Sequence, residues 1–214
     1  HDGIGCAATW RDFPAALAGE TGCGALVYSR AGYGGSDPVA LPRPLTYLHD
    51  EGFFALPELL DAAGVRHAFL VGHSDGGSIA LIHAGGAGRN VAGLVLMAPH
   101  VFVEDISISS IAQAKVAFET TDLGQKLGKY HRDSVKTFWG WNDIWLDPAF
   151  RSWNIEALLP AIPKPVLAVQ GEDDEYGTMA QVDSIARHVP QAQLLKLAAC
   201  GHSPQRDQPQ RVIQ

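Results

Sequence analysis

Residues 69–81 read FLVGHSDGGSIAL, and within them an apolar run stops at Gly-His-Ser-Asp-Gly-Gly before a second apolar run begins. The run 68–71 is apolar without alternation, which predicts a short, fully buried strand. The run that follows predicts a helix, so Ser74 is expected on a tight strand-to-helix turn. Gly72 and Gly76 lack a Cβ, which allows the turn to close and lets the helix approach the strand.

The five residues 72–76 fit Gly-x-Ser-x-Gly, the pattern of a nucleophile elbow. In an elbow, the serine stands above the sheet at a helix N-terminus, whose partial positive charge favours a developing anion. The alternative is a serine that only caps an ordinary helix, because Gly and Ser are common in turns. Other parts of the chain must therefore supply a base and an acid if Ser74 is a nucleophile.

Further apolar runs alternate with helical patterns along the chain. Strands are predicted at residues 25–28, 91–97, 165–170 and 193–197, and helices at 47–63, 179–188 and after Pro209. Gly64 is the expected C′ residue of the helix 47–63. Strands that alternate with helices favour an α/β fold with a mostly parallel sheet and helices on both faces.

The alternation is interrupted between Pro99 and Pro163, where no strand is predicted. We therefore divide the chain into residues 1–99 and 164–214, which form the core, and a helical insertion, residues 100–163, over one end of the sheet. Helical spacing begins at 107–127, and four of the five tryptophans follow at 139, 141, 145 and 153. Trp139 and Trp141, on either side of Gly140, are the first candidates for substrate contacts. The alternative is that these rings only form the core of the insertion.

A serine becomes a strong nucleophile when a histidine takes its proton and a carboxylate orients that histidine. Two loops that follow predicted strands contain such residues, Gly-Glu-Asp-Asp at 171–174 and Gly-His-Ser-Pro at 201–204. Both loops lie where parallel strands end, which is the edge at which open α/β sheets bind ligands.

These motifs together resemble the α/β-hydrolase superfamily over nearly the whole chain. The resemblance rests on GHSDGG (72–77), GEDD (171–174), GHSP (201–204) and the turn SRAGYGGSD (29–37), which is similar to the family's DxRGxGxS. It implies that Ser74 is the nucleophile, that His202 is the base, and that the helical insertion is the family's cap. The family's acid usually follows the strand-ending glycine by three residues, which favours Asp174 and leaves Asp173 as the alternative.

The resemblance also implies an oxyanion hole of two backbone N–H groups. One belongs to Asp75, the residue after the nucleophile. The other comes from a loop that the family marks with His-Gly, where this chain has His-Asp-Gly; counting back from Trp10 places the donor at Gly3. In that fold a central strand comes immediately before His1, so we expect N-terminal strands to be missing from this sequence.

Composition and charge exclude several other classes. Hydrophobic residues make up 46% of the 214 residues and charged residues 18%, which is typical of a globular domain. The net charge of −7 argues against a nucleic-acid partner, and no apolar run approaches the ~20 residues that span a bilayer. Three cysteines without a CxxC pair predict reduced thiols in a cytoplasmic protein.

No cofactor and no metal are expected. Residues 3–8 fit G-x-G-x-x-A, but a dinucleotide site requires that this pattern follow a strand, and only two residues precede it. The sequence also contains no metal-ligand spacing such as H-E-x-x-H.

The sequence therefore predicts a serine hydrolase that cleaves a small-molecule carboxylic ester through an acyl-enzyme. A thioesterase, a hydrolase of carbon–carbon bonds and a cofactor-free haloperoxidase use the same triad and remain open. A small-molecule receptor with the same fold and little turnover is the alternative from another class.

Overall fold

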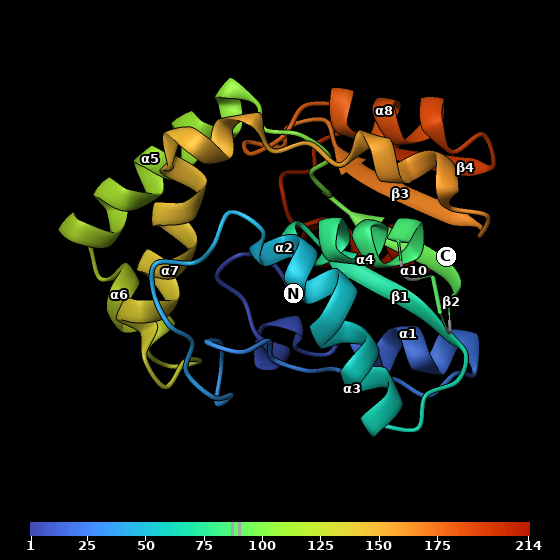
Figure 1. Ribbon diagram of the computed structural model, residues 1–214, viewed down its shortest axis with the longest axis horizontal. Helices are drawn as coiled ribbons and strands as arrows, with labels where there is room; N and C mark the ends of the chain where they lie inside the picture. Colours follow the sequence, from blue (N-terminus) through green and yellow to red (C-terminus); the bar gives the residue numbers. More distant parts are fainter. Residues whose placement is uncertain (87, 90) are drawn as a thin grey trace.

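A computed structural model of the protein describes residues 1–86, 88–89 and 91–214. The sheet that it describes has four parallel strands in the order β1-β2-β3-β4 (Figure 1). Their bounds are β1 Ala68–His73, β2 Val91–Met97, β3 Val166–Gly171 and β4 Ala192–Leu197. His73 pairs with Met97, and Gly171 with Leu197, so the strands end in line at one edge of the sheet.

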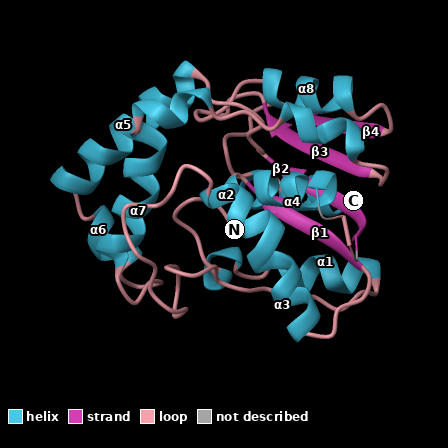
Figure 2. Cartoon of the chain, viewed as in Figure 1, coloured by secondary structure: helices cyan, strands magenta, loops and turns pink. Residues whose placement is uncertain are grey.

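Helices cover both faces of this sheet, as predicted (Figure 2). Because successive side chains point to opposite faces of a strand, Leu96 joins one buried cluster and Met97 joins another. The helices α4 Asp75–Gly86 and α8 Ala180–His188 pack on the Leu96 side, and α1 Phe13–Thr21 and α10 Pro209–Ile213 on the Met97 side. The short helix α9 Pro204–Asp207 precedes α10. The fold is therefore an α/β fold with a parallel sheet.

The predicted helix 47–63 is present, but its middle turn is widened. It consists of α2 Tyr47–Asp50, the π-helical turn η2 Glu51–Ala55 and α3 Leu56–Ala62. Pro57 has no backbone N–H, so an ordinary helical hydrogen bond cannot form there, and a π-helical turn accommodates the loss. Gly64 follows in a left-handed conformation, with φ 67°, which confirms its predicted place after the helix end.

The predicted strand at residues 25–28 is wrong. This segment pairs with no described strand, and Leu26 and Val27 are 53% and 37% exposed. A strand needs a neighbour that accepts and donates its backbone hydrogen bonds. In the described sheet β1 is an edge strand, and the 25–28 segment does not lie in register beside it. The short 3-10 helix η1 Ala7–Trp10 precedes α1 in the same N-terminal part.

The helical insertion contains helices and one isolated bridge, between Phe102 and Asn154. Its elements are α5 Asp105–Thr120, α6 Leu123–Leu127, α7 Ser134–Leu146 and the 3-10 helices η3 Pro148–Ser152 and η4 Glu156–Ala161. The single helix predicted at 107–127 is two helices, because Thr121 between them adopts an extended conformation. In Figure 1, α5, α6 and α7 stand to one side of the sheet. None of the helices in the described part of the chain has the length and apolar character needed to cross a membrane.

Candidate active site

Ser74 lies between β1 and α4 in a strained backbone conformation. Its φ is 54°, in the left-handed region that residues with a Cβ seldom adopt. The glycines around it are required by space, since a Cβ on Gly72 would lie 2.3 Å from the carbonyl oxygen of Gly76. Helix α4 begins at Asp75, so Ser74 stands at its N-terminus. This geometry is that of a nucleophile elbow.

The structure brings Ser74, His202 and Asp174 together in a continuous hydrogen-bonded chain. His202 lies in the loop after β4, and its Nε2 is 3.0 Å from Ser74 Oγ. Its Nδ1 is 2.8 Å and 2.9 Å from the two carboxylate oxygens of Asp174, in the loop after β3. With Nδ1–H donating to the carboxylate, Nε2 is left to accept from the serine hydroxyl. Ser74 and Asp174 are buried.

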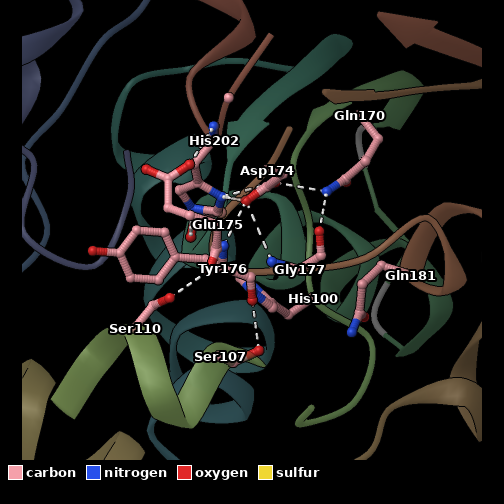
Figure 3. Close-up of polar contacts among 12 residues, drawn as sticks. His100, Ser107, Ser110, Gln170, Asp174, Glu175, Tyr176, Gly177, Gln181 and His202 are labelled. Carbon is pink, nitrogen blue, oxygen red and sulfur yellow. Dashed lines mark hydrogen bonds and ion pairs between the residues drawn. The ribbon is translucent and has the colours of Figure 1, made fainter. Parts of the chain in front are cut away.

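The geometry selects Asp174 over Asp173 as the partner of the histidine. The side chain of Asp173 is exposed, whereas Asp174 is held inside its loop by donors on both carboxylate oxygens (Figure 3). Oδ1 accepts from the backbone N–H groups of Tyr176, at 2.8 Å, and Gly177, at 3.3 Å. Oδ2 accepts from Gln170 Nε2 at 2.6 Å. Every polar neighbour of this carboxylate is thus a donor.

The same donors decide the charge of Asp174. Burial alone raises the pKa of a carboxyl group, but the hydrogen bond and charge of His202, with the Tyr176 N–H, hold the pKa of Asp174 below its ordinary value. Asp174 is therefore ionised at neutral pH. An ionised acceptor fixes the tautomer of His202 that leaves Nε2 free to take a proton.

The helical insertion supports the loop that contains Asp174. Ser107 of α5 donates to the Tyr176 carbonyl oxygen at 2.6 Å, and His100 Nε2 donates to the same oxygen at 3.1 Å (Figure 3). The Tyr176 ring lies against the imidazole of His202, with ring centroids 4.8 Å apart. The position of the acid thus depends on contacts from outside its own loop.

The two predicted oxyanion donors belong to the N-terminal segment, which contains Gly3, and to the first residue of α4, Asp75. The N-terminal segment packs directly on the elbow, because a Cβ on Gly76 would lie 2.9 Å from the backbone nitrogen and oxygen of His1. Neither the Gly3 N–H nor the Asp75 N–H donates to another group of the described residues. Backbone donors without an internal acceptor are what an oxyanion hole requires.

The two candidate tryptophans occupy different environments. Trp141 is buried, and its indole lies against Gly3, where an added Cβ would meet Trp141 Nε1 at 2.1 Å. Trp139 packs instead within the helical insertion, with its ring 5.7 Å from that of Phe118 and 5.5 Å from Lys115 Nζ. The structure thus brings Trp141 to the predicted oxyanion donor and places Trp139 away from it.

Sequence reasoning missed three side chains that support the site. Gln170 orients Asp174. His73 Nε2 donates to the His202 carbonyl oxygen at 2.6 Å. Arg30 donates to the Asp2 carbonyl oxygen in the N-terminal segment. Two of them left a signal in the sequence. Gln170 is the one polar residue of the apolar run 165–170, and His73 interrupts the elbow strand immediately before the serine. Buried polar residues at strand ends require partners.

Thiols and metal ligands are placed as follows. Cys6, Cys23 and Cys200 are free cysteines. Burial raises the pKa of the Cys200 thiol to about 11, so this thiol is protonated at neutral pH. The described residues contain no group of three or more His, Cys, Asp or Glu side chains that could hold a metal ion.

The chain matches the alpha/beta hydrolase family over residues 1–214, and it belongs to that family. No curated protein matches it. Among solved structures it is similar to a hydrolase from Pseudomonas aeruginosa, with a TM-score of 0.74 and 22% identity over 99% of this chain and 84% of that one.

Two further structures carry more informative descriptions. A thermophilic esterase from Thermogutta terrifontis has a TM-score of 0.66 and 21% identity, covering 95% of this chain and 82% of that one. A meta-cleavage product hydrolase from Pseudomonas fluorescens has a TM-score of 0.71 and 19% identity, covering 99% and 84%. At these identities the similarity establishes the fold, and the site must be argued from its own geometry.

The donor shell of Asp174 generates a prediction about the His202 proton. The backbone N–H groups of Tyr176 and Gly177 hold the amide oxygen of an asparagine at position 174. Its NH₂ then faces His202 Nδ1, which must accept, so the histidine proton shifts from Nδ1 to Nε2. In proton NMR, the parent should show a far-downfield Nδ1–H resonance that Asp174→Asn loses and Asp173→Asn, the matched control, keeps. Loss of the resonance in Asp173→Asn alone would show that the wrong acid was assigned.

Proposed function

We propose that the protein is a serine hydrolase that cleaves a carboxylic ester through an acyl-enzyme on Ser74. The observation that carries the proposal is the continuous chain from Ser74 Oγ through His202 to Asp174, at distances of 3.0 Å and 2.8 Å. The chain ends on a serine that the elbow holds at a helix N-terminus. Membership of the alpha/beta hydrolase family agrees with hydrolysis as the reaction class.

The first half of the proposed reaction transfers the acyl group to the enzyme. His202 Nε2 takes the hydroxyl proton as Ser74 Oγ attacks the ester carbon, and the carbonyl electron pair moves to oxygen. The Gly3 and Asp75 N–H groups stabilise this oxyanion. Asp174 stabilises the imidazolium by its charge, and the tetrahedral intermediate collapses as His202 donates the proton to the departing alkoxide.

The second half releases the acid. Water attacks the acyl carbon while His202 Nε2 takes one of its protons, and the oxyanion forms again at the same two N–H groups. Collapse breaks the bond to Ser74 Oγ, which recovers the proton from His202.

The helical insertion supports a substrate with an apolar acyl group. Its helix α7 presents Trp141 to the Gly3 segment, and the neighbouring ring of Phe138 lies 5.9 Å away. Phe138 is fully buried, so Trp141 is the ring of this pair that lies beside the N-terminal segment, where it favours an apolar substrate portion next to a polar reacting group. The described functions of an esterase and of a meta-cleavage product hydrolase with this fold support an acyl substrate for this chain as well.

Replacement of the nucleophile provides the first kinetic test. We expect the parent to hydrolyse p-nitrophenyl esters and Ser74→Ala to lose several orders of magnitude in kcat, since the corresponding loss in a serine protease is ~10⁶-fold. Ser78→Ala, one helical turn along α4, removes a buried hydroxyl that bonds only backbone oxygens and a backbone N–H, and it should stay within about tenfold of the parent. Activity of Ser74→Ala above a tenth of the parent would exclude Ser74 as nucleophile.

Substrate panels separate ester hydrolysis from its alternatives. Faster turnover of acyl thioesters than of matched oxygen esters would assign a thioesterase, and turnover of a ring-fission dienoate alone would assign a carbon–carbon hydrolase. Tight binding of an ester with almost no turnover would assign a receptor. Each of these results would contradict the proposed reaction while leaving the fold unaffected.

The two tryptophans generate a matched prediction on substrate preference. Trp141→Leu should change the ratio of kcat/KM between short and long acyl esters by roughly 10–200-fold, the effect of one or two apolar contacts. Trp139→Leu, which alters the packing within the helical insertion, should lower the melting temperature and leave the ratio unchanged. An equal change in both variants would show that Trp141 serves packing rather than substrate choice.

A further inference from the structure

We infer that Arg30 is a positioning residue of the oxyanion hole. It holds the hole in shape by binding, at the same time, the segment that contains Gly3 and the side chain of Asp75. The inference rests on the proposed function, because it requires the Gly3 and Asp75 N–H groups to act as the oxyanion donors. Arg30 follows the segment 25–28 in the glycine-rich turn, and its side chain is fully buried beside the elbow.

Arg30 orients the first proposed donor, the Gly3 N–H, through one peptide group. Arg30 Nη2 donates to the carbonyl oxygen of Asp2 at 2.9 Å. That carbonyl belongs to the same planar peptide unit as the Gly3 N–H, and in a trans peptide the two groups point in opposite directions. A guanidinium that binds the carbonyl therefore aims the Gly3 N–H away from Arg30. Rotation of this peptide would break a charge-assisted hydrogen bond in a buried place.

Arg30 holds the second proposed donor, the Asp75 N–H, through the side chain of Asp75. The same Nη2 atom lies 3.5 Å from Asp75 Oδ2, which also accepts a hydrogen bond from Tyr47 OH at 3.0 Å. Asp75 supplies the other oxyanion N–H from its own backbone at the start of α4. A carboxylate anchored at two points leaves this first residue of the helix little freedom to turn.

The network continues into the helical insertion. Trp145 Nε1 of α7 donates to Tyr47 OH at 2.9 Å, so the tyrosine accepts from the tryptophan and donates its own proton to Asp75. A connected path thus leads from α7 to the peptide of Gly3. Trp145, Tyr47 and Asp75 satisfy one another along this path, which makes that part of it rigid.

Charge balance gives Arg30 a second effect on the hole. Asp75 is 1% exposed, and an unpaired carboxylate there would oppose a second negative charge on the reacting oxygen. The guanidinium of Arg30 neutralises it. The face of the guanidinium covers the ring of Tyr33, 4.5 Å from the centroid, which keeps water from the pair.

Arg43 is a matched control for a purely structural role. It is also a buried arginine and lies over the same Tyr33 ring, 5.0 Å from its centroid. Its one hydrogen bond among the described residues goes to the Ala31 carbonyl oxygen, at 3.4 Å. It also lies over the Tyr47 ring, 5.6 Å from the centroid, but it donates to neither Asp2 nor Asp75. Loss of Arg43 therefore perturbs the same cluster without touching the oxyanion segment.

The test compares an inhibitor that forms an oxyanion with one that cannot. Ser74 Oγ adds to the carbonyl carbon of a trifluoromethyl ketone while His202 Nε2 takes the serine proton, and the carbonyl electron pair forms an oxyanion in the hole. The matching secondary alcohol fills the same space without forming that charge. Titration of active protein with a phosphonate makes each inhibition constant independent of any unfolded fraction.

We expect Arg30→Met to raise the inhibition constant of the ketone, and to lower kcat, by ~10²-fold, toward the loss seen when an oxyanion donor is removed. The inhibition constant of the alcohol and KM should stay within about threefold. Arg30→Lys and Tyr47→Phe should each give an intermediate loss, on the order of tenfold, because part of the network remains. Arg43→Met should leave the inhibition constant of the ketone unchanged.

Each outcome bears on the inference. If the parent hydrolyses esters but Arg30→Met binds the ketone as tightly as the parent does, the inference is wrong and the proposed function stands. If Arg30→Met does not fold, the measurement on Arg30→Lys decides the question. An inhibition constant of the ketone that is unchanged in Arg30→Lys overturns the inference. If the parent neither hydrolyses esters nor binds the ketone covalently, the proposed function fails, and the inference fails with it.

Discussion

The left-handed backbone of Ser74 is the constraint on which the rest of the site depends. A residue with a Cβ remains at φ 54° only when its surroundings hold it there, and here β1, α4 and the close approach of Gly72 to Gly76 do so. The same turn places the hydroxyl at the helix N-terminus, exposes the first N–H of α4, and leaves room above Gly76 for the N-terminal segment. The nucleophile, the helix dipole and the proposed oxyanion donor of Asp75 are thus positioned by one local conformation, against which the N-terminal segment packs.

The helical insertion acts on both sides of this turn. On one side, α5 hydrogen-bonds the loop that contains Asp174, through Ser107 and the Tyr176 carbonyl oxygen. On the other side, α7 reaches the elbow through Trp145 and Tyr47. The insertion is therefore more than a cover over the sheet edge. Substitutions within it are expected to alter the geometry of the reacting groups as well as the choice of substrate.

The sequence was informative wherever a motif is local, and much less so wherever a contact is distant. Ser74 and the loops of Asp174 and His202 follow apolar runs directly, so their places at the sheet edge were predictable from spacing. Arg30 belongs to the glycine-rich turn that resembles a family motif, but its partner Asp75 lies 45 positions away, and no local pattern reveals such a pairing. The strand expected at 25–28 failed for a related reason, because an apolar run becomes a strand only beside a suitable neighbour.

Covalent labelling measures most directly whether Ser74 is an activated nucleophile. The protein is treated with a fluorophosphonate, digested, and its peptides are analysed by mass spectrometry. We expect a single adduct, on Ser74. A folded protein that remains unlabelled, or that is labelled at another side chain, would contradict it.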